Sequence, residues 1–228
     1  FVLTVYDMIH EKFQDTVNDA KEISLKKKLL IEKASKIITI SQNTKNDLIK
    51  ILGTDEKKIN VVYLGNSINP NKTNNVKFKT PKKYLLFIGS RNGYKNFDKF
   101  IRSINEILKN DKELNIVCVG GGRFNKETVK YLQYLELSNQ VMQYNSDDKN
   151  LNYFYKNALA FVFPSHYEGF GIPVLESFTC GCPVICSNTS SLPEIAGDGA
   201  YFFDPTSEIS IKDSIQKVIE NSNLREDL

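Results

Sequence analysis

The chain has 228 residues, of which 41% are hydrophobic and 25% are charged, and its formal net charge is +3. It contains no apolar run near the roughly 20 residues that a membrane-spanning helix needs. We therefore expect a globular protein with one large or two small domains, and we expect no nucleic-acid partner.

The first 65 residues alternate between short apolar runs and helical patterns. The apolar runs cover residues 1–6, 36–40 and 60–63, and the helical patterns cover residues 23–34 and 45–52. Ser41 or Asn43 is expected to cap the second helix, and Gly53 to end it. Strands that alternate with helices at this spacing predict βαβ units of a parallel sheet.

Residues 66–83 are rich in Asn, Lys, Thr and Pro and show little periodicity, so we interpret them as a linker. The rest of the chain, residues 84–228, again alternates between strands and helices. Strands are predicted at 84–88, 115–119, 141–144, 161–163, 184–186 and 200–203. Helices are predicted at 97–108, at 126–137, after a cap at Asp147 or Asp148, from Pro173 onward, and at 208–220 with Ile209, Ile211, Ile215, Val218 and Ile219 on its apolar face. This order predicts a doubly wound α/β sheet, whose ligands bind beyond the carboxyl ends of the strands.

The most informative stretch is residues 163–183, with the sequence FPSHYEGFGIPVLESFTCGCP. Pro164 ends a buried strand, and Pro173 falls in the first turn of a helix, where its missing N–H is tolerated. Glu168 is placed in the intervening loop and Glu176 on the helix. The backbone amides of residues 169–172 can face the space over the helix N-terminus, which makes that space a ready site for an anion. A phosphorylated sugar would suit this site.

Residues 168–176 resemble, without a gap, the motif E-G-F-G-x-P-x-x-E of the retaining GT-B glycosyltransferases. The resemblance is to the large group 1 family (family 4), which contains bacterial mannosyl- and glucosyltransferases. The segments GCPVI, LPE, TVYDMIHEKF and ITISQNTKNDLI are also similar to that family. The resemblance implies a GT-B fold, with a nucleotide-sugar donor domain at 84–228 and part of an acceptor-side domain at 1–65. It further implies that the first half of the acceptor-side domain is absent and that the C-terminal end is truncated.

The same resemblance implies roles for individual residues. Arg91 and Lys95, in the loop GSRNGYKNF, would grip the donor diphosphate and stabilise the charge that develops on the leaving oxygen. Glu168 would bind hydroxyl groups of the transferred sugar, and Glu176 those of the ribose. The remaining donor-site candidates are Gly89, Gly121, Gly169, Phe170 and Gly171. His10 is a candidate on the acceptor side, with a structural histidine as the alternative.

The resemblance implies a retaining, metal-independent transferase that moves a hexosyl unit from a nucleotide diphosphate sugar to a glycan or lipid-linked acceptor in polysaccharide biosynthesis. The YKN loop favours GDP-mannose as the donor. Because no two aspartates are spaced D-x-D, we expect no metal and no other cofactor. We expect a cytoplasmic location, with contact at the cytoplasmic face of a membrane left open. The chain by itself is expected to bind the donor but to transfer little, with residues 1–65 poorly packed or dependent on a partner.

Several alternatives remain open from the residues alone. The chain could be a nucleotide-sugar-binding module without turnover, or a sugar-nucleotide epimerase of the same fold, although two histidines supply few acid/base groups. Glu168 and Glu176 could also be the two carboxylates of a glycoside hydrolase, but the Arg/Lys loop has no role in hydrolysis. The four cysteines are interpreted as buried thiols rather than as a zinc site.

Overall fold

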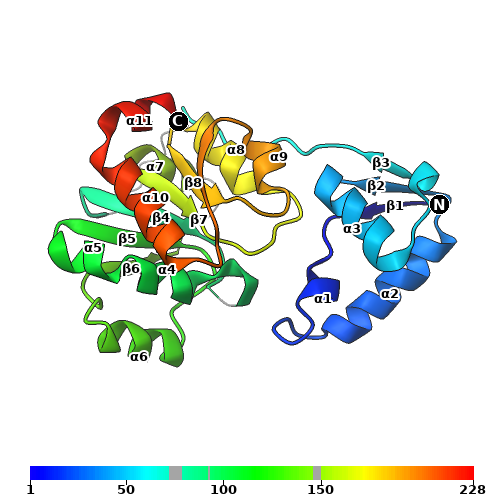
Figure 1. The fold of residues 1–228 in the computed structure, drawn as a ribbon, viewed down its shortest axis with the longest axis horizontal. Helices are drawn as coiled ribbons and strands as arrows, with labels where there is room; N and C mark the ends of the chain where they lie inside the picture. Colours follow the sequence, from blue (N-terminus) through cyan, green and yellow to red (C-terminus); the bar gives the residue numbers. More distant parts are fainter. Residues whose placement is uncertain (72–78, 92, 146–149) are drawn as a thin grey trace.

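The computed structural model describes residues 1–71, 79–91, 93–145 and 150–228. Figure 1 shows two α/β units, a smaller unit formed by residues 1–65 and a larger unit formed by the described residues from 79 onward. Strands within each sheet run parallel to their neighbours, as the alternating pattern predicts. The caps proposed at Asp147 and Asp148 lie outside the described residues.

The smaller unit contains one sheet with the strand order β1-β2-β3. Its strands are β1 (Val2–Val5), β2 (Lys36–Thr39) and β3 (Ile59–Val61), and its helices are α1 (Ile9–Lys12), α2 (Ala20–Lys33), α3 (Gln42–Leu52) and the 3-10 turn η1 (Glu56–Lys58). Ser41 caps α3 by accepting a hydrogen bond from the Thr44 amide. Gly53 follows the helix with a φ of 62°, a left-handed conformation that glycine adopts without strain. Both ends of α3 are therefore fixed as the sequence predicts.

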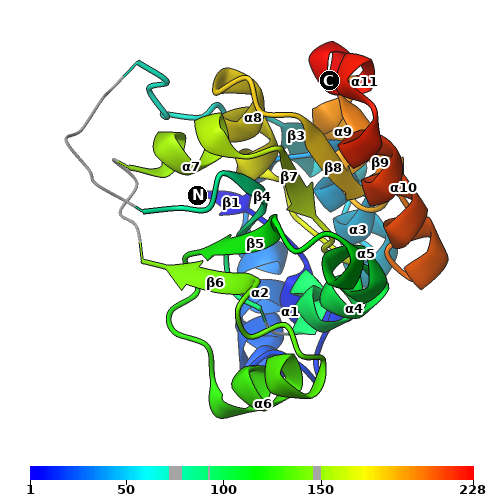
Figure 2. The ribbon, with the colours of Figure 1, turned by 90° about the vertical axis from the view of Figure 1, so that its left-hand side faces the viewer.

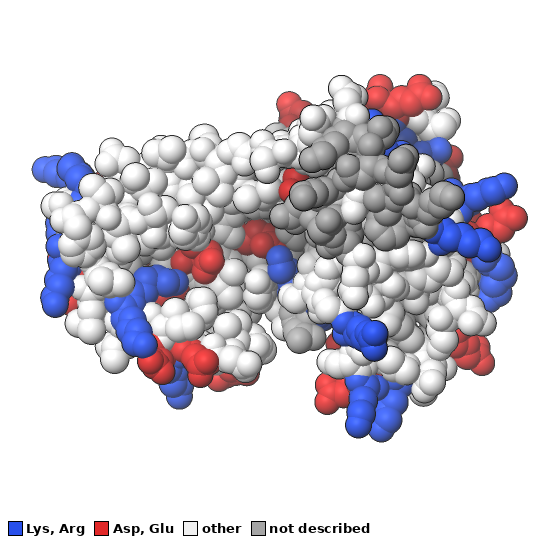
Figure 3. Space-filling view, turned by 180° about the vertical axis from the view of Figure 1, so that it is seen from behind, with Lys and Arg blue, Asp and Glu red and all other residues white. Residues whose placement is uncertain are grey.

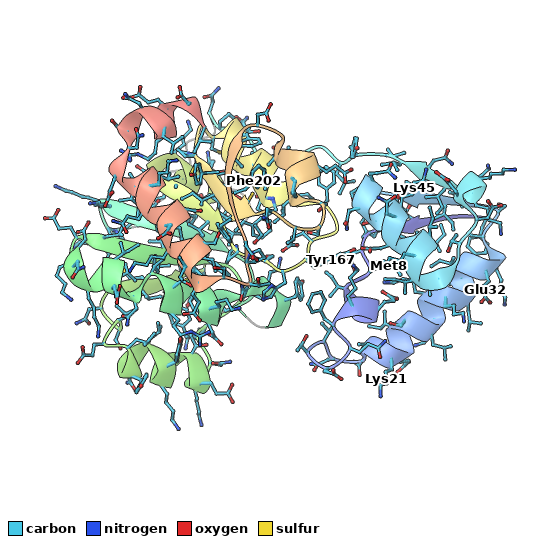
Figure 4. The ribbon with its side chains drawn as sticks, in the orientation of Figure 1. Met8, Lys21, Glu32, Lys45, Tyr167 and Phe202 are labelled. Atoms are coloured by element: carbon cyan, nitrogen blue, oxygen red, sulfur yellow. The ribbon has the colours of Figure 1, made fainter. Side chains whose placement is uncertain are left out.

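The smaller unit has a packed interior and an apolar surface. Its core joins residues of β1, β2, β3, α2 and α3 to Tyr167 of the larger unit, and Figure 4 shows Tyr167 reaching toward Met8. On the outside, Phe1, Val2, Tyr6 and Leu25 keep 59–60% of their surface exposed. The expectation that this unit is poorly packed therefore does not hold for its interior. Its surface nevertheless carries large exposed apolar side chains.

The larger unit is built on a six-stranded parallel sheet with the order β6-β5-β4-β7-β8-β9. Counted within this unit, the order is 3-2-1-4-5-6, the arrangement of doubly wound dinucleotide-binding folds. The strands are β4 (Lys83–Ile88), β5 (Leu114–Val119), β6 (Val141–Tyr144), β7 (Ala160–Phe163), β8 (Val184–Ser187) and β9 (Ala200–Phe203). The helices are η2 (Gly93–Lys95), α4 (Phe97–Ser103), α5 (Asn105–Asn110), α6 (Lys126–Tyr134), α7 (Leu151–Asn157), α8 (Ile172–Thr179), α9 (Leu192–Ala196), α10 (Glu208–Glu220) and α11 (Ser222–Asp227).

Helices cover both faces of this sheet (Figure 2). Alternate side chains of β4 point to opposite faces, because successive residues of a strand do so. Leu85 and Phe87 join a core with residues of α4, α5, α6 and α10. Tyr84 and Leu86 join a second core with residues of α7, α8 and α9, and this core also contains Cys180, Cys182 and Cys186. All four cysteines are free and buried, as predicted.

Three predicted helices differ in detail from the structure. The helix predicted at 97–108 is two helices, α4 and α5, which meet at Ile104. The helix predicted at 126–137 ends at Tyr134, because Glu136 has a φ of 63° and a left-handed residue cannot continue a right-handed helix. On α10, Ile209 is 72% exposed although the apolar pattern includes it, whereas Ile211 is fully buried.

Among the described residues, none of the helices is both long enough and apolar enough to span a lipid bilayer.

Candidate functional site

The candidate site lies where the connections of the large sheet diverge. β4 pairs with β5 on one side and with β7 on the other. From β4 the chain crosses to β5, and from β7 it crosses to β8, so these two connections run toward opposite sides of the sheet. The loop after β4, with described residues 89–91 and 93–96, and the loop after β7, residues 164–171, therefore end at one edge of the sheet. We call them the β4 loop and the β7 loop. Ligands of open α/β sheets bind at such a point.

Lys95 and Glu168 meet at this point. Lys95 ends the turn η2 in the β4 loop, and its Nζ lies 2.7 Å from Glu168 Oε1 in the β7 loop. Their side chains are only 15% and 11% exposed. Lys95 Nζ also lies 5.2 Å from the ring centre of Phe163, the last residue of β7. The two residues predicted to contact phosphate and sugar are thus held side by side, with little solvent around them.

Hydrogen bonds to the backbone hold the two loops together. Asn96 donates from Nδ2 to the carbonyls of Pro164 and Pro205, at 3.1 and 2.9 Å. The His166 amide donates to the Tyr94 carbonyl at 2.8 Å. Burial, with Glu168 nearby, raises the pKa of Tyr94 to about 12, so this phenol stays neutral. The spacing between Lys95 and Glu168 is therefore set by main-chain contacts beside both residues.

A serine pair before α9 shapes the β7 loop. Ser190 Oγ accepts a hydrogen bond from the Glu168 amide at 2.9 Å. Ser191 is fully buried, and its Oγ lies 2.9 Å from the Glu168 carbonyl and 2.8 Å from the Phe170 carbonyl. These bonds fix the backbone on both sides of Gly169.

The β7 loop leads into the N-terminus of α8. Gly171 is the N-cap residue, with a φ of 104°, and Pro173 occupies the first turn, as predicted. Among the described residues no side chain caps this helix. The helix dipole favours negative charge above this uncapped N-terminus. An added Cβ at Gly171 would lie 2.8 Å from Leu192 Cδ2, so the position requires glycine on two grounds.

Glu176 lies one turn further along α8. Its Oε2 accepts a hydrogen bond from the Tyr155 hydroxyl at 2.9 Å. Burial, followed by the nearby Glu176 carboxylate, raises the pKa of Tyr155 well above its ordinary value, so the phenol remains a hydrogen-bond donor. Glu176 is thus oriented by a buried partner, as a residue that binds a ligand hydroxyl needs to be.

Arg91 has backbone partners that the sequence did not indicate. Its Nη1 donates to the Gly120 carbonyl at 2.8 Å, and its Nη2 donates to Gly121 and Gly122 at 2.9 and 2.6 Å. The guanidinium also lies 5.0 Å from the ring centre of Phe124. Arg91 is 7% exposed, and burial lowers its pKa. In this arrangement Arg91 holds the glycine turn after β5, and its predicted role toward the diphosphate stays a prediction.

Gly89 and Gly121 lie against each other beyond the carboxyl ends of β4 and β5. Both have positive φ, 107° and 66°. An added Cβ at Gly121 would lie 2.4 Å from the Gly89 carbonyl oxygen, so the two backbones are already in contact. Their role in the donor site stays a prediction.

The smaller unit touches the β7 loop directly. Ser41 Oγ donates to the Gly169 carbonyl at 2.7 Å, and the Tyr167 hydroxyl donates to Asp47 at 2.7 Å. An added Cβ at Gly169 would lie 2.1 Å from the Tyr6 carbonyl oxygen, so the backbones of the two units touch there. Figure 3 shows a notch between the units, with acidic and basic side chains beside it. The loop that holds Glu168 is therefore also part of the interface between the units.

His10 lies on α1 in the smaller unit. It lines a hollow of about 310 Å³ together with Tyr6, Ile23 and Leu30. Its Nδ1 is buried and, among the described residues, has no hydrogen-bond partner. A role for His10 toward the acceptor stays a prediction.

Comparison with known proteins identifies the family. Residues 69–228 match the family described as "Glycosyl transferases group 1". The chain belongs to this family, and its two parallel-sheet units have the GT-B fold.

The relatives that match with most of the chain are bacterial and archaeal glycosyltransferases. The chain is 28% identical, over 217 residues, to the O-antigen chain mannosyltransferase RfbU of Salmonella typhimurium. This match covers 95% of this chain and 60% of RfbU. A shorter match of 79 residues, 46% identical, links it to O-antigen chain mannosyltransferase B of Escherichia coli and covers 35% of this chain and 21% of that protein. The chain thus spans about 60% of the length of RfbU.

Solved structures share the fold at low sequence identity. Anabaena Alr3699/HepE in complex with UDP and glucose superposes with a TM-score of 0.78 at 20% identity, covering 99% of this chain and 63% of that one. Sucrose-phosphate synthase from Thermosynechococcus elongatus superposes with a TM-score of 0.80 at 19% identity, covering 99% and 60%.

The structure brings most predicted site residues to one place. Lys95, Glu168 and the three residues 169–171 meet at the edge shared by β4 and β7, whereas His10 lies in the other unit. Sequence reasoning missed Ser190, Ser191 and Tyr155. The serines directly precede the LPE segment, but their hydrogen-bond partners lie more than 20 residues away.

Replacing Arg91 separates a structural role from a phosphate-binding role. Arg91→Ala leaves three carbonyls without their charged donor, and we expect a loss of about 2–3 kcal/mol in the free energy of unfolding. Arg91→Lys should restore little of this, because one ammonium group cannot replace the two nitrogens of the guanidinium. Urea denaturation measures the effect, and Arg123→Ala, an exposed arginine in the same turn, is the control. A variant as stable as the parent that binds nucleoside diphosphates poorly would instead support the phosphate role.

Proposed function

We propose that the protein containing this chain is a retaining, metal-independent hexosyltransferase. It transfers a hexosyl unit, with mannose favoured, from a nucleotide diphosphate sugar to a glycan or lipid-linked acceptor in polysaccharide biosynthesis. The named activities of its relatives support the mannosyl assignment, and they belong to longer proteins. A cytoplasmic location and a site without metal are part of this proposal.

One observation carries the proposal: the contact between Lys95 and Glu168 beside the N-terminus of α8. A donor sugar presents hydroxyl groups, which need an acceptor, next to a diphosphate, which needs positive charge. The carboxylate, the ammonium group and the helix amides supply these features within one small region. Glu176, further along α8 and bonded to the Tyr155 hydroxyl, would accept hydrogen bonds from the ribose.

The proposed reaction includes the following bond changes. The bond between the anomeric carbon and the diphosphate oxygen breaks, and a bond from that carbon to the acceptor oxygen forms on the same face of the sugar. The proton of the acceptor hydroxyl passes to the departing diphosphate, so no side chain has to act as a covalent nucleophile. Lys95 stabilises the negative charge that grows on the leaving oxygen, and its low exposure strengthens this effect.

Replacing Lys95 tests the diphosphate assignment. Lys95→Ala should weaken GDP binding roughly 10- to 100-fold, because a hydrogen bond to a charged partner is lost. Guanosine has no phosphate, so its affinity should not change. Calorimetric titration of both ligands measures the difference, with UDP and ADP as arms that identify the preferred base. Lys99→Ala, which removes a lysine whose ammonium group donates to the Thr206 carbonyl, is the matched control. Equal losses for GDP and guanosine would overturn the assignment.

The two glutamates should separate the nucleotide from the sugar. Glu176→Ala is expected to weaken GDP itself, because the ribose loses its acceptor. Glu168→Ala should leave GDP binding close to that of the parent chain and weaken GDP-mannose, because only the intact donor carries the sugar. Glu208→Ala, which breaks an exposed ion pair with Arg102, is the control for removal of a carboxylate. If both site variants bound GDP like the parent chain, Glu176 would have no role at the ribose.

A further inference from the structure

Glu194 joins the two units through the end of a helix. It lies on α9 of the larger unit, within the LPE segment, and is half-buried. Its Oε1 accepts a hydrogen bond from the Gln42 amide at 2.6 Å, and its Oε2 accepts one from the Asn43 amide at 3.0 Å. These amides belong to the first turn of α3 in the smaller unit. A carboxylate from one unit thus caps a helix of the other, where the helix dipole favours negative charge.

A third contact reaches Glu194 from the smaller unit. A hydrogen bond with the Glu194 carboxylate raises the pKa of the Tyr63 phenol above its ordinary value. The Tyr63 ring lies 6.3 Å from the ring centre of Phe170 in the β7 loop. Glu194 and the residues around it therefore form a compact connection between the units.

The same segment that carries Glu194 also shapes the β7 loop. Ser190 and Ser191, directly before α9, bind the backbone of Glu168 and Phe170. Leu192, the first residue of α9, lies against Gly171. A movement of α3 that pulls on Glu194 would thus be transmitted to the loop that places Glu168 beside Lys95.

We propose that Glu194 is a positioning residue that latches the two units in the arrangement of this structure, which we call closed. It does so by capping α3, and α9 links this latch to the loop of Glu168. Its consequence for sugar transfer rests on the proposed function, but the latch itself acts without any nucleotide. The Ser41 and Tyr167 contacts support the interface, whereas Glu194 brings a full negative charge to two unshared backbone donors.

A proline substitution can remove one of the two donors with little effect on the helix. Gln42 is the first residue of α3, a position that tolerates proline because its amide has no partner within the helix. Ser41, the residue before it, has a φ of −153° and a ψ of 160°, which is an extended conformation that a following proline accepts. Gln42→Ala keeps the amide and removes only the side chain, which bonds to Asn46. The pair therefore isolates one backbone hydrogen bond to Glu194.

The experiment measures closure without ligand. We expect Glu194→Ala and Gln42→Pro to increase the radius of gyration in small-angle X-ray scattering, and Gln42→Ala to leave it unchanged. Hydrogen exchange at the Asn43 amide should become about tenfold faster in Glu194→Ala, because its charged partner is lost. The double variant Glu194→Ala, Gln42→Pro should open no further than Glu194→Ala alone, since that substitution already removes the bond that Gln42→Pro removes.

Two results would overturn the latch. One is an unchanged radius of gyration and unchanged Asn43 exchange in Glu194→Ala. The other is equal behaviour of Gln42→Pro and Gln42→Ala. Glu194→Gln, which keeps one side-chain oxygen as an acceptor, should lie between the parent and Glu194→Ala, and it serves if the alanine variant folds poorly. Because no nucleotide is present, failure of GDP to bind would count against the proposed function and leave the latch result standing.

Discussion

The parallel pairing of β4 with β7 is the constraint on which the candidate site depends. These strands are adjacent in the sheet, with Leu85 opposite Ala160, although helices and two other strands separate them in the chain. Only this pairing brings the loops after both strands to one edge. Lys95 and Glu168, 73 positions apart in sequence, meet there because hydrogen bonds from the Asn96 side chain and the His166 amide tie the loops together. The ion pair is a consequence of the sheet order.

The second feature of the structure is that the same loop serves two purposes. Residues 165–171 lie over the N-terminus of α8, where a phosphate would be stabilised, and they also touch the smaller unit. The contact of Gly169 with Tyr6 leaves no room for a side chain, so the interface between the units requires the glycine of the motif. Relative movement of the units and the geometry of the candidate site are therefore physically connected.

Local patterns predicted much of this fold because the forces behind them are local. The apolar runs at 141–144 and 200–203 are the observed strands β6 and β9, and Ser41 and Gly53 delimit α3 as their chemistry predicts. The position of Pro173 at the start of α8 follows from its missing amide hydrogen. The family motif placed Glu168 in a loop and Glu176 on a helix, and both lie there.

Long-range contacts could not be predicted in the same way. The partners of Arg91 are carbonyls 29 to 31 residues away, and those of Glu194 are amides 151 and 152 residues away. No spacing in the sequence encodes such contacts, because they depend on the order of the strands and on the placement of the units. The break at Ile104 and the exposure of Ile209 are likewise decided by tertiary packing rather than by helical periodicity.

Hydrogen exchange with and without saturating GDP tests the central claim most directly, namely that the edge shared by β4 and β7 binds the donor nucleotide. The account predicts slower exchange in residues 93–96 and in residues 165–176 when GDP is present, because their amides lie in the two loops and in the first turns of α8. The hollow beside His10 should show no change. Slower exchange at that hollow, with both loops unaffected, would contradict the account.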